Sequence, residues 1–121
     1  MHRIYVYGTL KRGYGNYERL LEGRSTFIGE AISAPEFVMI SLGGFPGIVR
    51  GGETPIHGEI FEVSDEVLAR LDRLEGHPTW YERQPITVTL TDGTTAEVEG
   101  YVLPASYLTR GPHISTGIWG A

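Results

Sequence analysis

The sequence predicts an α+β fold, a small and mostly antiparallel β-barrel flanked by two or so helices. Its 17 glycines and 7 prolines are spread over all 121 residues, which divides the chain into many short elements. Most of these elements are rich in β-branched and aromatic residues, and only two carry helix signals. Many short, twisted strands in so small a chain favour a closed or partly closed barrel.

The expected strands are short apolar or alternating runs bounded by glycine, proline or polar residues. Asp92-Gly93 is a strong turn signal and predicts a long hairpin. Residues 43–47 are expected to form a turn, followed by a short apolar pair, Ile48-Val49. The chain after Pro104 is expected to be turns and irregular structure. In chain order, the predicted strands are residues 3–7, 26–32, 37–41, 57–63, 86–90 and 96–102.

The two helix signals differ in strength. Asn16 is expected to cap a short helix that covers residues 16–21. The clearer helix starts at Ser64, a good N-cap, and two acidic residues follow where the helix dipole favours negative charge. Gly76 stands where a left-handed C-cap residue is expected. The apolar face of this helix consists of Val67, Leu68, Leu71 and Leu74.

Composition narrows the class of protein. We expect a single domain, residues 1–121, because this length can bury a real core and 40% of the residues are hydrophobic. Without cysteine there is no disulfide, thiol nucleophile or thiolate metal site. A net charge of −5 argues against nucleic acid as a partner. The sequence shows no targeting segment and no apolar run of membrane-spanning length, so a cytoplasmic location is expected.

The first candidate for chemistry is the tetrapeptide Tyr7-Gly8-Thr9-Leu10, which follows the first predicted strand. Glycine at this point permits a tight turn and lets a ligand approach the backbone. Successive N–H groups that point the same way can bind an anion or hold an oxyanion. The same tetrapeptide is also compatible with a plain strand-ending turn.

The second candidate is Glu75, which lies at the negative end of the Ser64 helix. A carboxylate is locally unfavourable at that position, and local rules are often broken at functional sites. The helix terminus would raise the pKa of the carboxyl, which suits a group that both accepts and donates a proton. The structural alternative is an exposed glutamate paired with Arg73 or Arg83.

Three residues beyond this helix complete the candidates. Tyr81 can hydrogen-bond a ligand, and Glu82 can either face Glu75 or open a strand. Tyr101 points either into a polar barrel interior or to the surface. The four histidines are scattered without metal-ligand spacing, so no metal site is predicted. There is also no Gly-x-Ser-x-Gly elbow and no dinucleotide or P-loop fingerprint.

Together these motifs resemble the γ-glutamyl cyclotransferase-like superfamily, which includes γ-glutamylamine cyclotransferases and AIG2-like proteins. The similarity covers most of the chain up to about Tyr101, and the order and spacing of the motifs make it fairly specific. It fades after Leu103, so no role is transferred to the tail. The motifs are residues 5–13, 45–49, 58–61 and 71–76, followed by Tyr81 and Arg83.

The resemblance implies a small β-barrel in which the Tyr7-Gly8-Thr9-Leu10 loop holds a γ-glutamyl group and Glu75 is the catalytic carboxylate. Tyr81 and Tyr101 are expected to contribute to substrate binding. The implied reaction needs no cofactor: the α-amine of the substrate attacks its own γ-carbonyl and releases 5-oxoproline and a free amine. Residues 43–53 and the tail after Pro104 are expected to shape the pocket for the leaving amine.

Other functions stay open at this point. The same fold can serve as a non-catalytic module that binds a small ligand. A small barrel can bind oligonucleotides or sugars, although the acidic charge argues against nucleic acid. A glycosidase that uses Glu75 and Glu82 is a weaker possibility. The sequence leaves open the identity of the leaving amine and the oligomeric state.

Overall fold

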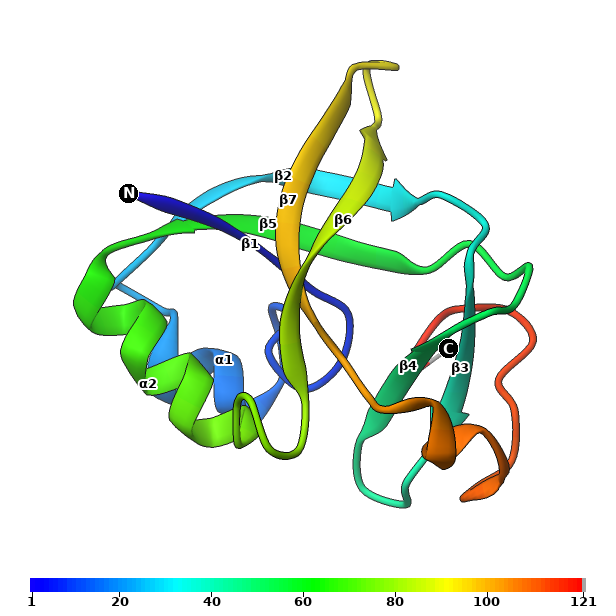
Figure 1. The fold of residues 1–121 in the computed structure, drawn as a ribbon. Helices are drawn as coiled ribbons and strands as arrows, with labels where there is room; N and C mark the ends of the chain where they lie inside the picture. Colours follow the sequence, from blue (N-terminus) through cyan, green and yellow to red (C-terminus); the bar gives the residue numbers. More distant parts are fainter. Residues whose placement is uncertain (121) are drawn as a thin grey trace.

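The protein is described here from a computed structural model, in which residues 1–120 are placed. Five strands form a closed barrel in the order β1-β5-β2-β6-β7, which confirms the predicted α+β barrel (Figure 1). All neighbouring pairs are antiparallel except β1 and β7, whose parallel pairing sets Tyr5 opposite Gly100 and closes the barrel. The barrel strands are β1 His2–Val6, β2 Thr26–Ser33, β5 His57–Val63, β6 Glu82–Leu90 and β7 Thr95–Val102.

Two further strands form a separate two-stranded sheet beside the barrel (Figure 1). They are β3, Phe37–Ser41, and β4, Pro46–Arg50. The turn predicted for residues 43–47 is therefore too long, because Pro46 pairs with Ser41 and already belongs to β4. Proline is acceptable there because it is the first residue of a strand in a sheet that has only edges.

The tail packs against this small sheet. A short 3-10 helix, η1 Ala105–Thr109, follows the last barrel strand where irregular chain was predicted. The segment after it lies along β3, where the backbone N–H of Ser41 donates to the oxygen of Pro112 and that of Ile114 to Met39. The tail thus satisfies β3 backbone groups that the two-stranded sheet leaves free.

The two helices lie side by side on one flank of the barrel (Figure 1). Helix α2, Asp65–Glu75, has the predicted caps: the Ser64 hydroxyl accepts from Val67 N–H at 3.2 Å, and Gly76 is left-handed at φ 68°. Helix α1, Gly15–Leu20, is capped differently from the prediction. Tyr14 holds its N-cap position, and the Asn16 amide instead donates to the Thr9 hydroxyl at 2.8 Å.

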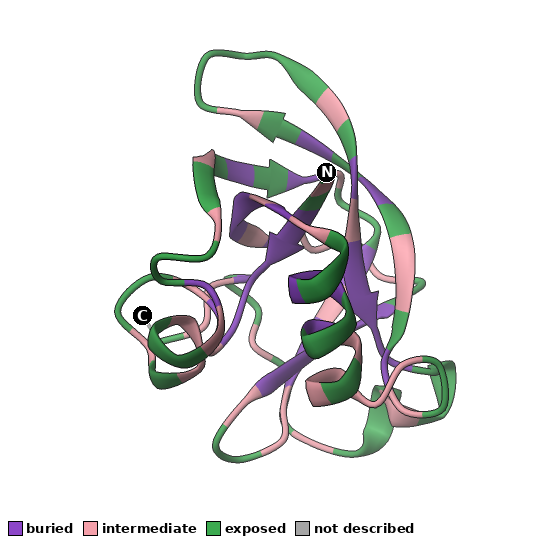
Figure 2. Ribbon diagram, turned by 90° about the vertical axis from the view of Figure 1, so that its left-hand side faces the viewer, coloured by how far each residue is buried: buried purple, intermediate pink, exposed green. Residues whose placement is uncertain are grey.

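The strand alternation of β1 divides the core into two clusters. Ile4 and Val6 belong to the cluster beneath α2, whose buried stripe faces the barrel while its other side is exposed (Figure 2). Tyr5 and Tyr7 belong to the second cluster, which consists largely of residues from the barrel strands. Within residues 1–120, no helix is long and apolar enough to cross a membrane.

Candidate active site

A cavity of about 230 Å³ lies where the end of β1, the end of α2 and the β3–β4 turn meet. All seven residues predicted to form the site line this one cavity, although they come from four separate parts of the sequence: Tyr7, Gly8, Thr9, Leu10, Glu75, Tyr81 and Tyr101. The other lining residues are Tyr5, Val6, Asn16, Gly44, Phe45, Pro46, Leu74 and Trp80. The sequence prediction therefore selected residues that the fold brings together.

The loop after β1 has free backbone donors. Two of its carbonyls are used, since Gly8 O accepts from Lys11 N–H at 3.0 Å and Thr9 O from Tyr17 N–H at 3.3 Å. Over residues 1–120, the N–H groups of Gly8, Thr9 and Leu10 have no hydrogen-bond acceptor in the protein. Backbone donors that the protein leaves unpaired beside a cavity are suited to bind an anionic ligand group.

Of the two reasons predicted for Gly8, a tight turn and close approach of a ligand, the structure does not support the first. Its φ is not in the left-handed region, so the turn itself does not demand glycine. A Cβ at this position would instead lie 2.8–2.9 Å from the ring of Pro46, closer than such carbons approach in proteins. The missing side chain lets the β3–β4 turn pack directly on the loop and close one wall of the cavity.

Glu59 fixes the far end of the same loop, and the sequence prediction missed this role. Its side chain is buried in β5, with a residue exposure of 7%. One carboxylate oxygen accepts from the backbone N–H of Arg12 at 2.8 Å, and the other faces Nε of Arg12 at 3.3 Å. The Arg12 guanidinium also stacks 3.7 Å from the centre of the Phe27 ring. The loop is thus held at both ends.

Glu75 is the last residue of α2, and its side chain is only partly exposed. Its carboxylate has no hydrogen-bond or ion-pair partner among residues 1–120, where Arg83 instead binds Asp72 and Glu99. Burial raises the pKa of Glu75 to about 7. The direction agrees with the prediction, and its cause in the structure is loss of water contact. A carboxyl with this pKa can accept and donate a proton near neutral pH.

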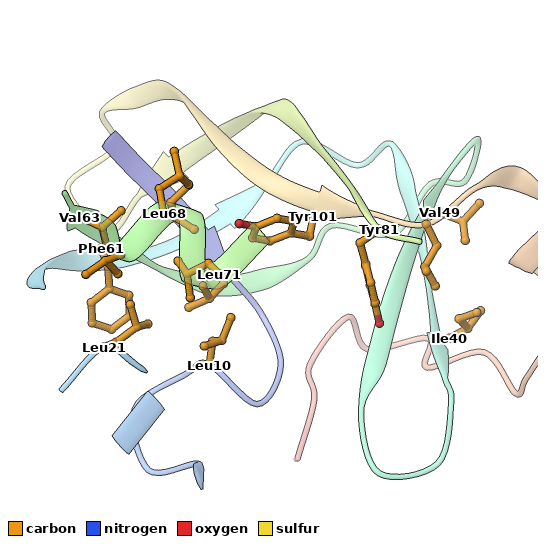
Figure 3. Packing of buried hydrophobic residues seen from close by; sticks show 14 residues of the cluster. Leu10, Leu21, Ile40, Val49, Phe61, Val63, Leu68, Leu71, Tyr81 and Tyr101 are labelled. Atoms are coloured by element: carbon orange, nitrogen blue, oxygen red, sulfur yellow. The ribbon is translucent and has the colours of Figure 1, made fainter. Parts of the chain in front are cut away.

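The three tyrosines of the site use their hydroxyl protons within the protein. Tyr7 donates to the carbonyl of Tyr101 at 2.8 Å, and Tyr81 donates to that of Pro46 at 2.8 Å. Tyr101 donates to the carboxylate of Asp72 at 2.7 Å, and Figure 3 shows its hydroxyl directed toward α2. Burial raises the pKa of all three hydroxyls, so they stay protonated near neutral pH. Their rings therefore form part of the cavity wall, and their hydroxyl groups connect it by hydrogen bonds to β7, the β3–β4 turn and α2.

The hydrogen bond from Tyr101 to Asp72 is part of a cluster of charged residues next to the cavity wall. Arg83 donates to both oxygens of Asp72 at 2.9 and 3.2 Å, and to Glu99 at 2.7 Å. Burial acts to raise the pKa of Asp72, but the bonds from Arg83 and Tyr101 outweigh it and hold that pKa below its usual value. Asp72 is therefore a fixed anion that anchors Tyr101, whereas Glu75 one helical turn later is free to titrate.

One predicted alternative, a carboxylate pair of Glu75 and Glu82, finds no support in this geometry. Glu82 is exposed, accepts from Gln84 at 2.8 Å and does not line the cavity, so it is not paired with Glu75. The part of the chain that the structure describes contains no group of three or more His, Cys, Asp or Glu side chains placed to hold a metal ion.

Comparison with known proteins decides the family. The model of the family described as gamma-glutamyl cyclotransferase, AIG2-like, matches residues 4–121. The chain belongs to this family. A gamma-glutamylcyclotransferase family protein of Citrobacter rodentium is 34% identical over 97% of this chain and 94% of its own length. The gamma-glutamylaminecyclotransferase of Rattus norvegicus is 34% identical over 76% of this chain and 66% of its own length.

The fold of this γ-glutamyl cyclotransferase family member is also seen in solved structures. A crystal structure of an AIG2-like protein from Mus musculus superimposes with a TM-score of 0.83 at 27% identity. The match covers 95% of this chain and 86% of the mouse chain. This chain therefore shares its fold, a small barrel with two helices, with the mouse AIG2-like protein.

Only part of the segments expected to shape a pocket for the leaving amine lines the cavity. Gly44, Phe45 and Pro46 line the cavity, but residues 47–53 do not. No residue of the described tail, 104–120, lines it either: the tail bonds to β3 through Pro112 and Ile114 and to β5 through Gly117. Trp80 also lines the cavity and was not predicted; its position between the motif residues Gly76 and Tyr81 was the available signal.

Proposed function

We propose that this protein is a γ-glutamyl cyclotransferase that acts on a γ-glutamyl amine or γ-glutamyl amino acid and releases 5-oxoproline. The observation that carries the proposal is the carboxylate of Glu75. It has no protein partner among residues 1–120, its pKa is raised by burial to about 7, and it shares a cavity with unpaired backbone donors. Family membership supports the reaction type, since relatives are named for it.

In the proposed reaction, the γ-glutamyl group binds with an anionic oxygen against the N–H groups of Gly8, Thr9 and Leu10. Glu75 removes a proton from the α-ammonium group of the substrate. The freed amine attacks the γ-carbonyl carbon of the same molecule, and a five-membered ring forms through a tetrahedral oxyanion. The oxyanion collapses, the amide C–N bond breaks, and Glu75 returns its proton to the departing nitrogen.

The proton balance requires no water and no cofactor. The α-ammonium group loses two protons as it becomes the ring amide, and the departing amine gains two as it leaves as an ammonium ion. Glu75 carries these protons one after the other, the second being taken from the ring nitrogen after the attack. Because the two reacting centres belong to one molecule, the contribution of the protein is to fold the glutamyl chain and keep it in attack geometry. A rigid cavity wall of hydrogen-bonded tyrosines serves that purpose.

The test is the Glu75→Gln variant in an assay of 5-oxoproline release from γ-glutamyl amides. The substitution keeps the shape of the side chain and removes its acid–base function. Turnover is expected to fall by about 10²–10⁴-fold, the usual contribution of a general acid–base group. Circular dichroism and thermal unfolding serve as controls for folding. Near-normal turnover would contradict the role of Glu75. Ligand binding by the unmodified protein without any product would support the non-catalytic module instead.

A further inference from the structure

Asn16 lines the cavity, and the proposed reaction gives it no role. It is the second residue of α1, which follows directly on the loop that carries the free backbone donors. Its amide nitrogen lies 2.8 Å from the hydroxyl oxygen of Thr9, and its amide oxygen lies 2.8 Å from Nη2 of Arg19. Arg19 is exposed, whereas Thr9 lines the same cavity as Asn16. A series of hydrogen bonds therefore runs from the surface of α1 to the cavity.

The direction of each of these hydrogen bonds follows from the chemistry of the groups. A guanidinium group can only donate, so the atom of Asn16 that faces Arg19 must be its carbonyl oxygen. The amide nitrogen of Asn16 then faces Thr9, and since this nitrogen can only donate, the Thr9 oxygen must accept. The hydroxyl proton of Thr9 is consequently directed away from Asn16.

This proton has no acceptor in the part of the chain that the structure describes, where Asn16 is the only hydrogen-bond partner of the Thr9 hydroxyl. The lining residues of the cavity include no arginine, lysine or histidine within residues 1–120. An anionic ligand group in this cavity is therefore bound by neutral donors, and the Thr9 hydroxyl is available beside the three free N–H groups of the loop. A hydrogen bond to a charged group contributes more than one between neutral groups.

We infer that Asn16 is a positioning residue, which keeps the Thr9 hydroxyl as a donor to the anionic oxygen of the γ-glutamyl group. This inference rests on the proposed function, and it adds to the site a fourth donor and the residue that orients it. A threonine hydroxyl can rotate and can accept as well as donate. The hydrogen bond from Asn16 occupies its accepting side, so that the proton is left for the ligand.

The first experiment removes the hydroxyl. Thr9→Val keeps the shape of the side chain, and kcat/KM for γ-glutamyl-ethylamide is expected to fall by about 10–100-fold, the contribution of one hydrogen bond to a charged group. Thr9→Ser keeps the hydroxyl and is expected to retain most of the activity. Thermal unfolding of both variants serves as the control for folding. A near-normal kcat/KM in Thr9→Val, or an equal loss in Thr9→Ser, would overturn the inference.

A double-mutant cycle tests the role of Asn16, with Asn16→Ala made in the unmodified protein and in Thr9→Val. In the unmodified protein, kcat/KM is expected to fall by about 2–10-fold. In Thr9→Val it should change little, because no hydroxyl is left to orient. If Asn16 only supported the loop, or bound the substrate itself, the two losses would multiply, and that result would overturn the inference. Glu18→Ala, at an exposed position of α1 outside the cavity, is the control and should leave kcat/KM unchanged.

A binding measurement separates this inference from the proposed function. Calorimetric titration of the Glu75→Gln variant with γ-glutamyl-ethylamide needs no turnover. Adding Thr9→Val is expected to raise Kd by about tenfold or more. Adding Asn16→Ala should raise Kd less, and both together should raise it no further than Thr9→Val does. This binding pattern without any product from the unmodified protein would reject the reaction and retain the positioning role. Product formation with losses that multiply would retain the reaction and overturn the positioning role.

Discussion

The chemistry of the site depends on a carboxylate in an environment that disfavours its charge. Glu75 is set apart from the nearby carboxylates by its surroundings, because Asp72 on the same helix is neutralised by Arg83 while Glu75 has no such partner within residues 1–120. Two carboxyl groups one helical turn apart therefore have pKa values shifted in opposite directions. The one with the raised pKa is the candidate for proton transfer.

A second residue-scale requirement is the absence of a side chain at position 8. In Gly8→Ala, the new Cβ would lie 2.8–2.9 Å from Pro46, so the loop and the β3–β4 turn must separate. The backbone donors of the loop would then be misplaced, and we expect KM for γ-glutamyl substrates to rise and kcat/KM to fall by about 10²-fold. Steady-state kinetics of 5-oxoproline release measures this.

The control for this variant is Gly15→Ala. Gly15 begins α1, has no positive φ and has open space around its Cβ position. Alanine favours helix over glycine by about 1 kcal/mol, so this variant should be at least as stable as the unmodified protein. Kinetic parameters that change equally in both variants would show that the effect is not specific to the contact with Pro46.

At the scale of elements, the end of α2 links helix geometry to the site. Gly76 stops the helix in a left-handed conformation, φ 68°, and Trp80 packs on it. Gly76→Ala should lower the free energy of unfolding by about 1–2 kcal/mol because of the left-handed backbone, and it should displace Trp80 and Glu75 as well. We therefore expect a loss of both stability and kcat, measured by urea unfolding and by 5-oxoproline release.

Gly93→Ala separates these two effects. Gly93 is also left-handed, at φ 87°, but it lies in the β6–β7 turn with nothing within 4 Å of its Cβ position. Its substitution should cost a similar free energy of unfolding while kcat stays unchanged. If Gly93→Ala reduced kcat as much as Gly76→Ala, general destabilisation would account for both results.

The same elements show which parts of the fold local sequence could predict. The boundaries of α2 follow from short-range chemistry, the Ser64 hydroxyl at one end and Gly76 at the other, and both were predicted correctly. Pro46 and Asn16 were assigned wrongly because tertiary contacts override their local preferences. Pro46 opens a strand beside Ser41, and Asn16 serves the Thr9 hydroxyl instead of a helix end.

At the scale of the whole molecule, the cavity is a product of long-range closure. The parallel β1–β7 pair joins Tyr5 to Gly100, and Tyr7 bonds to the Tyr101 carbonyl. Hydrophobic periodicity carries no information about such distant pairings. The motifs of the family supplied Glu75 and the loop. Phe45 lay in the segment 43–53 that was expected to shape the pocket, whereas Trp80 and its contact with Phe45 lay outside the prediction, because that contact exists only after the β3–β4 turn packs against the end of α2.

The raised pKa of Glu75 also has a consequence for the stability of the whole molecule. Below the unfolded-state pKa of 4.5, Glu75 is protonated in both states and carries no penalty. Between that value and about 7, the unfolded chain loses this proton while the folded protein keeps it, so the free energy of unfolding falls as pH rises. Above about 7 the folded state holds a poorly solvated charge, and the penalty is fully present.

The Glu75→Gln variant should therefore be more stable than the unmodified protein at pH 8 and nearly equal to it at pH 4. The expected gain at pH 8 is on the order of 1–3 kcal/mol, since a full shift of this size is reduced by the water that still reaches a partly exposed carboxylate. Urea unfolding at the two pH values measures this gain, and taking the difference between the two variants cancels the titration of all other groups.

Glu97→Gln, at an exposed position of β7, is the control and should alter the free energy of unfolding by less than about 0.5 kcal/mol at both pH values. A gain in Glu75→Gln that is the same at pH 4 and pH 8 would mean that the carboxylate is not desolvated, and the proton-transfer role would lose its physical basis. A gain that grows between about pH 4.5 and 7 and then levels off, together with lost turnover, would show that the protein gives up stability to keep this group reactive.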